Sequence, residues 1–226
     1  MTCLNALLHT ACWSITLSLA MPLLAEDRCT AGPAGPHDFD YLAACRPRPV
    51  HAHEKAAVVG TLPPSGALTT FTSAQRAKIE GLAAVLRLHE REAVYEVRFI
   101  DVPQAWLGLH RRAVLLVSVP ALNMLKPGEL QALVAHEIGH EYLLAEWEAA
   151  RATGDYPWLR RLEATCDTIA ALTLRALGLS TNTLVSAITK IERYNRTRFG
   201  VPLNSSSYPS AGERRRLLEK FSSGKG

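Results

Sequence analysis

The sequence predicts an α+β fold in which a small sheet packs against two long helices. Two segments between residues 95 and 119 have strand-like patterns, and apolar residues recur at helical spacing on both sides of them. The 226 residues are 48% hydrophobic and 20% charged, which suffices for one substantial core. The formal net charge of +4 comes from arginines without interleaved aromatic residues, so a solvated basic face is favoured over a nucleic-acid site.

The N-terminal segment 1–25 is expected to be a signal peptide or an N-terminal anchor. Its apolar run ends before Glu26, the first charged residue, as in export signals, so we expect a periplasmic or secreted protein. The segment has no Lys or Arg, and Leu23 would occupy position minus three of a cut after Ala25. An uncleaved anchor that tethers the protein to the membrane therefore stays an alternative, and a buried helix is a weaker one.

Residues 26–72 are rich in Pro, Gly and Ala and are expected to form an arm with little regular structure. Cys29 and Cys45 flank a loop in this arm, so a disulfide between them is possible in an oxidising compartment, and Cys166 would then stay a free thiol. The pair in His51-Ala52-His53 has no third ligand nearby, which favours a solvated loop over a metal site.

From Ser73 the pattern changes to helical spacing, with Ser73 as a plausible cap of an amphipathic helix. The alternation from Tyr95 to Phe99 predicts a half-buried strand, and the apolar run from Ala113 to Val119 predicts a more central strand. Pro127 and Glu129 then mark the start of a helix that runs through the 130s and 140s.

That helix carries the segment His136-Glu137-Ile138-Gly139-His140. Residues four apart lie on one face of a helix, so both imidazoles can reach one zinc ion while Glu137 projects towards a metal-bound water. Zinc lowers the pKa of its bound water towards ~7, and a neighbouring carboxylate can accept the proton as the water attacks a carbonyl carbon. Because two histidines at this spacing also arise by chance, a third ligand is needed.

A second predicted helix, whose apolar stripe begins at Leu159, supplies a candidate third ligand in Glu163. Asp167 follows four residues later, so Glu163 can bind zinc while Asp167 accepts the remaining ring N–H of a liganding histidine. Alone, Glu163 would be an ordinary surface residue, and it is the upstream motif and Asp167 that favour the ligand role. Cys166 lies within the apolar stripe, which favours core packing over zinc binding.

Together these residues resemble the gluzincin zinc metallopeptidases of the CAAX prenyl-protein endopeptidase and HtpX group. The resemblance begins with the HEIGH segment and the E-x-x-x-D pattern of the next helix, and it covers residues 73–221. Three further segments are similar to parts of that family: an edge segment at Gln104-Ala105-Trp106, the entry of the zinc helix at Pro127-Gly128-Glu129-Leu130, and a closing segment from Tyr208 to Arg214.

The resemblance implies a compact zincin-type domain that acts as a zinc metalloendopeptidase, with Glu137 as the catalytic base. Tyr208 stands where the family has His, a position implied to stabilise the tetrahedral oxyanion, and a phenol can donate a comparable hydrogen bond. An extended or unfolded polypeptide substrate is expected along the edge at Gln104, Ala105 and Trp106.

No segment after residue 25 offers about 20 uninterrupted apolar residues, so we expect a soluble, compact relative that touches a membrane only through an uncleaved N-terminal segment. Two more helices, around 181–194 and 211–221, would complete the domain, and 222–226 would form a flexible tail. Arg214 would support the zinc site if it pointed inward, but a solvent-facing residue is favoured.

Two alternatives to an active endopeptidase stay open. A zinc-binding scaffold or chaperone-like protein with little turnover would retain the fold; the intact Glu137 argues against it, whereas Tyr208 in place of His argues slightly for it. A latent protease is the other alternative, in which the arm 26–72 blocks the metal through Cys29 or the two neighbouring histidines.

Overall fold

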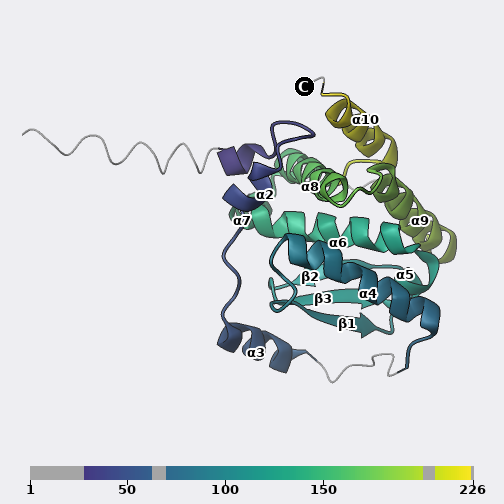
Figure 1. The fold of residues 1–226 in the computed structure, drawn as a ribbon. Coiled ribbons are helices and arrows are strands. Elements are labelled where there is room, and N and C mark those ends of the chain that lie inside the picture. The colour runs from purple at the N-terminus through teal and green to yellow at the C-terminus, as the bar shows by residue number, and fades with distance from the viewer. Residues whose placement is uncertain (1–27, 63–69, 201–206, 225–226) are drawn as a thin grey trace, which may run out of the picture.

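The fold is built around helix α6 (Pro127–Tyr142), which lies between a three-stranded sheet and helix α8 (Tyr156–Ala176), as Figure 1 shows. The computed structural model describes residues 28–62, 70–200 and 207–224, so the predicted signal peptide or anchor lies outside the described residues. The expected α+β class is confirmed. The other elements, in chain order, are α2 (Asp40–Ala44), α3 (Ala52–Thr61), α4 (Ser73–Leu88), β1 (Glu96–Ile100), β2 (Leu107–His110), β3 (Val114–Ser118), α5 (Val119–Met124), α7 (Leu144–Thr153), α9 (Asn182–Phe199) and α10 (Ala211–Ser222).

The sheet has the order β1-β3-β2, with β1 parallel and β2 antiparallel to the central strand β3. Strands β1 and β3 confirm the two strands expected from the sequence. Strand β2 has no counterpart among them, because its four residues are too few to show an alternating pattern. It nevertheless forms the edge of the sheet that faces α6 and the candidate site.

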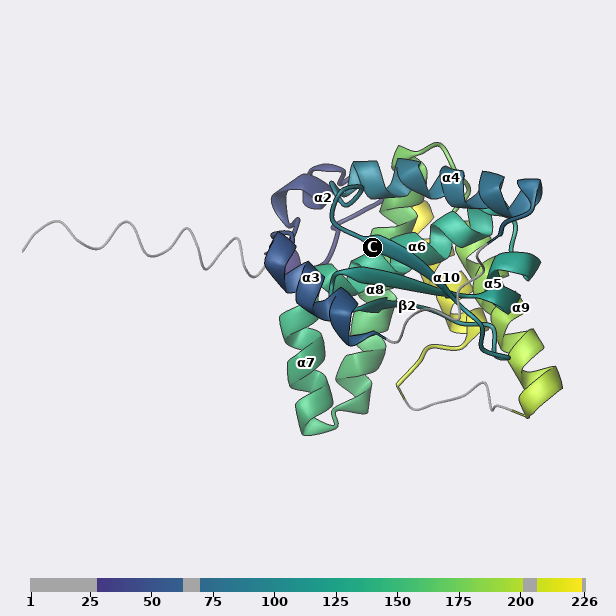
Figure 2. The same cartoon turned by 90° about the horizontal axis from the view of Figure 1, so that it is seen from below.

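Helix α6 starts at Pro127 as expected, and its first turn is capped by Glu129, whose Oε2 accepts the backbone N–H of Lys126 at 2.8 Å. Most of the helix is buried, since α4, α8, α9 and β2 all contact it. The expected helix through the 140s is in fact two helices, because α6 ends at Tyr142 and α7 follows. Helix α7 and the start of α8 form a pair that projects from the rest of the domain (Figure 2).

The expectation of little regular structure in residues 26–72 is wrong for the part that the structure describes. Helices α2 and α3 lie within it, and Tyr41 and Leu42 of α2 are buried in the core. The disulfide between Cys29 and Cys45 is present, and the Tyr41 hydroxyl donates to the Cys29 carbonyl at 2.7 Å. Two adjacent buried residues are too short a pattern to reveal a packed helix, which is why composition misleads here.

A buried ionic cluster around Glu141 ties this N-terminal segment to α6. Arg91, only 1% exposed, donates to the two carboxylate oxygens of Glu141 at 2.8 and 3.2 Å and to the carbonyl of Pro47 at 2.6 Å. The Tyr95 hydroxyl and Arg112 Nε add donors to Glu141 at 2.5 and 3.1 Å. The carboxylate is therefore the counter-ion on which two guanidinium groups depend.

We expect Glu141→Ala to lower the free energy of unfolding by about 3–5 kcal/mol, because it leaves buried Arg91 without its counter-ion. Denaturant titration monitored by circular dichroism measures the loss. Glu92→Ala is the control, since Glu92 forms an exposed pair with Arg87 at 3.2 Å and should change stability by less than about 1 kcal/mol. Equal effects of the two substitutions would contradict the prediction.

His89 gives the fold a pH-dependent stability. Its buried ring has Nδ1 2.9 Å from the Tyr142 hydroxyl and Nε2 2.9 Å from Thr173 Oγ1. Burial, assisted by the charge of Arg91, lowers the pKa of His89 to about 3, against ~6.5 in an unfolded chain. Below pH ~6.5 the unfolded state binds a proton that the folded state excludes. The stability linked to His89 is thus complete above pH ~6.5 and is lost as the pH falls towards 3.

Between pH 7 and pH 4.5 we expect the wild-type protein to lose about 2 kcal/mol more unfolding free energy than His89→Gln, which has no titrating ring at this position. Denaturant midpoints of both proteins at the two pH values test this. Parallel losses in both proteins would show that His89 is not the source.

Candidate metal centre

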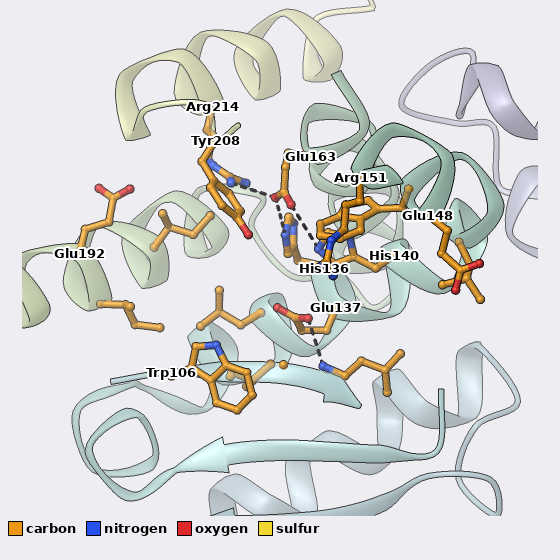
Figure 3. Close-up of a pocket in the computed structure, with 18 residues that line it drawn as sticks. Trp106, His136, Glu137, His140, Glu148, Arg151, Glu163, Glu192, Tyr208 and Arg214 are labelled. Atoms are coloured by element: carbon orange, nitrogen blue, oxygen red, sulfur yellow. Dashed lines mark hydrogen bonds and ion pairs between the residues drawn. The ribbon is translucent and has the colours of Figure 1, made fainter. Parts of the chain in front are cut away.

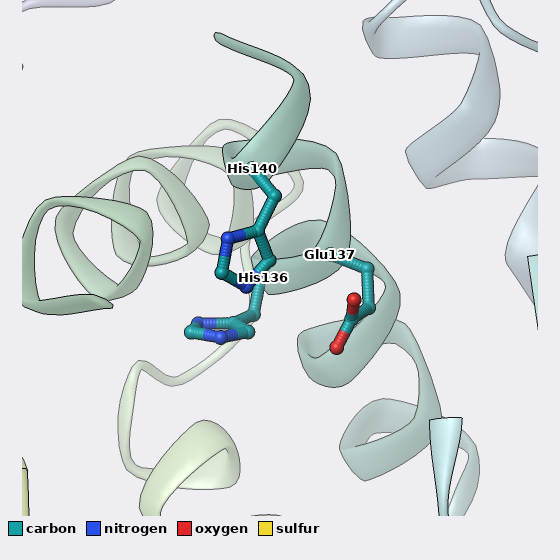
Figure 4. A group of neighbouring side chains, drawn as sticks. All are labelled: His136, Glu137 and His140. Atoms are coloured by element: carbon teal, nitrogen blue, oxygen red, sulfur yellow. The ribbon is translucent and has the colours of Figure 1, made fainter. Parts of the chain in front are cut away.

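Helix α6 places His136, Glu137 and His140 together. The two histidine rings lie on one side of the helix, one turn apart, with Glu137 beside them (Figure 4). Their ring centroids are 5.0 Å apart, and candidate ligand atoms of the three side chains lie within 4.8 Å of one another. The helical spacing read from the sequence therefore gives the expected cluster.

Helix α8 brings Glu163 against both histidines. Its Oε2 lies 3.3 Å from Nε2 of His136, and its Oε1 lies 3.5 Å from Nε2 of His140 (Figure 3). Asp167, one turn further along α8, lies 2.9 Å from Nδ1 of His136, although without the alignment of a regular hydrogen bond. Side chains that the sequence singled out on two separate helices thus meet at one point.

This donor set fits zinc. Two imidazole nitrogens and one carboxylate are ligands that zinc prefers at catalytic sites, where a further position stays open. The Nε2 atoms of His136 and His140 both face Glu163, whose Oε1 is buried and has no hydrogen-bond partner among the described residues. Asp167 approaches the opposite ring nitrogen of His136, which leaves Nε2 for a metal.

The approach of α8 to α6 depends on Gly139, which lies between the two histidines in sequence. A Cβ atom at this position would lie 2.9 Å from the Cα and 3.2 Å from the carbonyl oxygen of Cys166 on α8. Both contacts are with backbone, which cannot rotate away, so any larger residue would push the helices apart. Glu163 and Asp167 flank Cys166, and their reach to the histidines therefore requires glycine here.

Arg214 of α10 contacts the two carboxylates that α8 contributes to the site. It is 4% exposed and pairs with Glu163 at 3.2 Å and with Asp167 at closer range. The favoured interpretation of Arg214 as solvent-facing is therefore wrong. Helical spacing could not separate a face that packs on α8 from a face in water, because α10 is rich in charged residues all round.

Burial and the charges of the centre shift its pKa values in opposite directions. Burial raises the pKa of Glu137 to about 7. Glu163 has a pKa of about 2, because the contacts with His136, the charge of His140 and Arg214 outweigh its burial. Burial and the neighbouring His136 lower the pKa of His140 to about 4. A carboxylate whose pKa lies near neutrality is suited to accept and release a proton, and this singles out Glu137 within the group.

The centre opens into a cavity of about 810 Å³, here called the cleft. Its walls come from β2, α6, α7, α8 and α9. Tyr208 and Trp106 line it as well, and Figure 3 shows the Tyr208 ring pointing towards the histidines and Glu137. Burial raises the pKa of the Tyr208 hydroxyl, which therefore stays a neutral hydrogen-bond donor at neutral pH.

The segment Gln104-Ala105-Trp106 contributes only Trp106 to the cleft. Ala105 is buried, and the Asn195 side chain bonds both of its backbone groups, at 2.9 Å to the N–H and 2.8 Å to the carbonyl. These groups are not available to a substrate. The open backbone edge lies further along the chain, in β2.

The register of β2 shows which of its groups face outward. Because the Ser118 N–H bonds to the Trp106 carbonyl, pairing alternates so that Gly108 points towards β3 while Leu107 and Leu109 point to the outer edge. The Leu109 N–H donates to Oε2 of Glu137 at 3.3 Å, which agrees with this alternation. The free edge of the sheet therefore runs directly past the candidate base.

Comparison with known families agrees with this geometry. Residues 72–144, from the cap of α4 to the start of α7, match the model of peptidase family M48. This segment is similar to a peptidase family M48 domain. Peptidases of family M48 depend on zinc, and the HExxH helix lies inside the matched segment. Among curated proteins, no match to the chain is found. Glu163, Tyr208 and Arg214 lie beyond the matched residues, so their roles rest on the geometry of the site.

Replacing Gly139 tests the contact between α6 and α8. We expect Gly139→Ala to weaken zinc binding at least tenfold and to lower unfolding free energy by about 1–3 kcal/mol, because the added methyl meets the backbone of α8. Gly128→Ala on the same helix is the matched control, since a Cβ there would meet only Thr183 at an ordinary 3.7 Å. Competition with a zinc-binding dye measures the affinity, and unchanged affinity in Gly139→Ala would contradict the proposed dependence.

Proposed function

We propose that this protein is a metalloendopeptidase that binds zinc through His136, His140 and Glu163 and hydrolyses extended polypeptides. One observation carries the proposal: Glu163 meets both imidazoles beside Glu137, and this group opens into a cleft bordered by a free strand edge. A closed structural zinc site would use neither a carboxylate base nor an open side.

Bound zinc would supply a Lewis acid that lowers the pKa of a water molecule and polarises the scissile carbonyl. Glu137 then acts as the general base that takes the proton from the attacking water and passes it to the leaving amine. Its pKa of about 7 allows both steps near neutral pH. The N–H of Leu109 holds the carboxylate towards the cleft.

Tyr208 and Arg214 have separate roles in this proposal. Tyr208, whose hydroxyl is neutral and faces the cleft, donates a hydrogen bond to the developing oxyanion. Arg214 contacts no substrate and instead positions Glu163 and Asp167 through its two ion pairs. The site thus keeps a hydrogen-bond donor for the oxyanion, although Tyr208 stands where the family that the chain resembles has histidine.

The substrate would lie as an added strand along β2, pairing with the outward backbone groups of Leu107 and with the outward carbonyl of Leu109, whose N–H is bonded to Glu137. Main-chain pairing of this kind requires an extended or unfolded polypeptide and does not itself select a sequence. Trp106, which lines the cleft, would lie beside the substrate, whereas the backbone groups of Ala105 are already bonded to Asn195.

We further propose that the protein acts outside the cytosol, either free or tethered through residues 1–25. The Cys29–Cys45 disulfide supports an oxidising compartment. Within the described residues, no helix is both long enough and apolar enough to cross a membrane.

The described residues offer no support for latency through the N-terminal segment. Cys29 is already bonded to Cys45, and the wall of the cleft includes no residue from 28–62. The rings of His51 and His53 stack on each other at the exposed start of α3. The following measurement distinguishes an active peptidase from a zinc-binding scaffold with little turnover.

We expect the purified protein to bind one zinc and to cleave unfolded casein in a chelator-sensitive manner. Glu137→Gln should keep the zinc and lose activity by 10²-fold or more, because it lacks the base. Glu163→Ala should lose both zinc and activity. Zinc content by atomic absorption and cleavage by a fluorescent casein assay give the two readouts. Zinc without cleavage in the wild type would favour a scaffold, and full zinc content with activity in Glu163→Ala would refute the third ligand.

A further inference from the structure

The two ends of the cleft differ in chemistry. Towards α7 its lining includes the charged residues Glu148 and Arg151, and Arg151 lies over the Trp147 ring at 5.0 Å. Towards α9 four apolar side chains from α6, α9 and the edge segment line it, and the carboxylate of Glu192 lies at the outer end. We call this part the apolar chamber: Trp106, Leu133, Ile188 and Ile191.

Helix geometry and hydrogen bonds position the walls of the chamber beside the metal centre. Leu133 lies one turn before Glu137 on α6, so it borders the candidate base. Ile191 lies one turn before Asn195 on α9, and Asn195 clamps both backbone groups of Ala105, the residue next to Trp106. The walls from α6, α9 and the edge segment are therefore fixed relative to one another.

Trp106 is a rigid floor of the chamber. Its indole lies across Gly108, where a Cβ atom would come within 2.5 Å of the ring. Its backbone is fixed by Ser118, whose Oγ accepts the Trp106 N–H at 2.8 Å and whose N–H donates to the Trp106 carbonyl at 2.9 Å. The side chain nevertheless remains 44% exposed. A large aromatic ring held in place yet open to solvent is typical of a binding surface.

We propose that the apolar chamber binds a large apolar side chain next to the scissile bond, with Trp106 as the residue that determines this specificity. The inference rests on the proposed peptidase activity of the same centre. A substrate strand paired with Leu107 and Leu109 would direct alternate side chains to the face that Trp106 covers. Burying a leucine or phenylalanine side chain against these walls removes apolar surface of both partners from water.

Charged side chains fit the chamber poorly. None of its four side chains carries a charge that could pair with a buried charged group, which would lose its hydration with little compensation. Glu192, which follows Ile191, stands at the outer end of the cleft (Figure 3) and forms no ion pair among the described residues. Its carboxylate would repel an acidic substrate residue at this end.

Peptides that differ at a single position test the proposal. We would use quenched fluorescent peptides with Leu, Phe, Ala, Asp or Lys at each of the two positions that flank the cleaved bond. At one of these positions, kcat/KM for Leu or Phe should exceed that for Ala roughly tenfold or more, with Asp the poorest. Affinity of the same peptides for Glu137→Gln, measured by calorimetry, gives a readout that needs no turnover.

Variants then test whether Trp106 causes this preference for a large apolar side chain. Trp106→Ala should remove most of the preference for Leu over Ala, chiefly through KM, while zinc content stays at one per chain. Trp106→Phe should restore part of the preference. Phe199→Ala is the matched control, because Phe199 is also an exposed aromatic residue, 38% accessible, but lies outside the cleft.

Equal cleavage of all peptides, a preference for a charged residue, or an equal loss for every peptide in Trp106→Ala would overturn the proposal. If no peptide is cleaved, the peptidase assignment fails, and the calorimetric comparison decides the chamber separately. Tighter binding of Leu than Ala peptides to Glu137→Gln, lost on adding Trp106→Ala, would support it. Equal affinities would refute it.

Discussion

The candidate centre depends on the close contact of α6 with α8 at Gly139. The carboxylate of Glu163, the third candidate ligand, reaches the two imidazoles only because position 139 has no side chain. The backbone of Cys166 lies where that side chain would otherwise stand. Glu163 and Asp167 lie on either side of this contact, so both reach the histidines from a single approach. The glycine is therefore as much a part of the site as the groups that carry charge.

Gathering two carboxylates beside the two histidines would be unfavourable without a permanent cation. Arg214 supplies it, since a guanidinium keeps its charge at every physiological pH and can contact Glu163 and Asp167 together. The pKa of Glu163 is low beside this cation, whereas Glu137 is the carboxylate whose pKa burial brings near neutrality. The division between binding groups and a proton acceptor thus follows from where Arg214 lies.

The sequence predicted the elements whose apolar or functional residues recur at a regular spacing, and it missed those without such a pattern. HExxH, the E-x-x-x-D helix and the long strands show up as fixed spacings, and the structure gives each of them. Strand β2, helix α2 and the inward direction of Arg214 depend on which distant segment packs against them. Gly139 is part of the motif in the sequence. That this position requires glycine is evident only from the structure, where the backbone of α8 packs against it.

Helix α6 is held from two sides, which fixes its rotation about its own axis. His140 faces the cleft, whereas Glu141, the next residue and 100° further round, enters the ionic cluster with Arg91 and Arg112. A rotation that moved the imidazole would also pull this carboxylate away from the buried guanidinium of Arg91, at a cost of several kcal/mol. The cluster on the far side of the helix, which also binds the N-terminal segment through Pro47, therefore orients the metal-binding face without touching it.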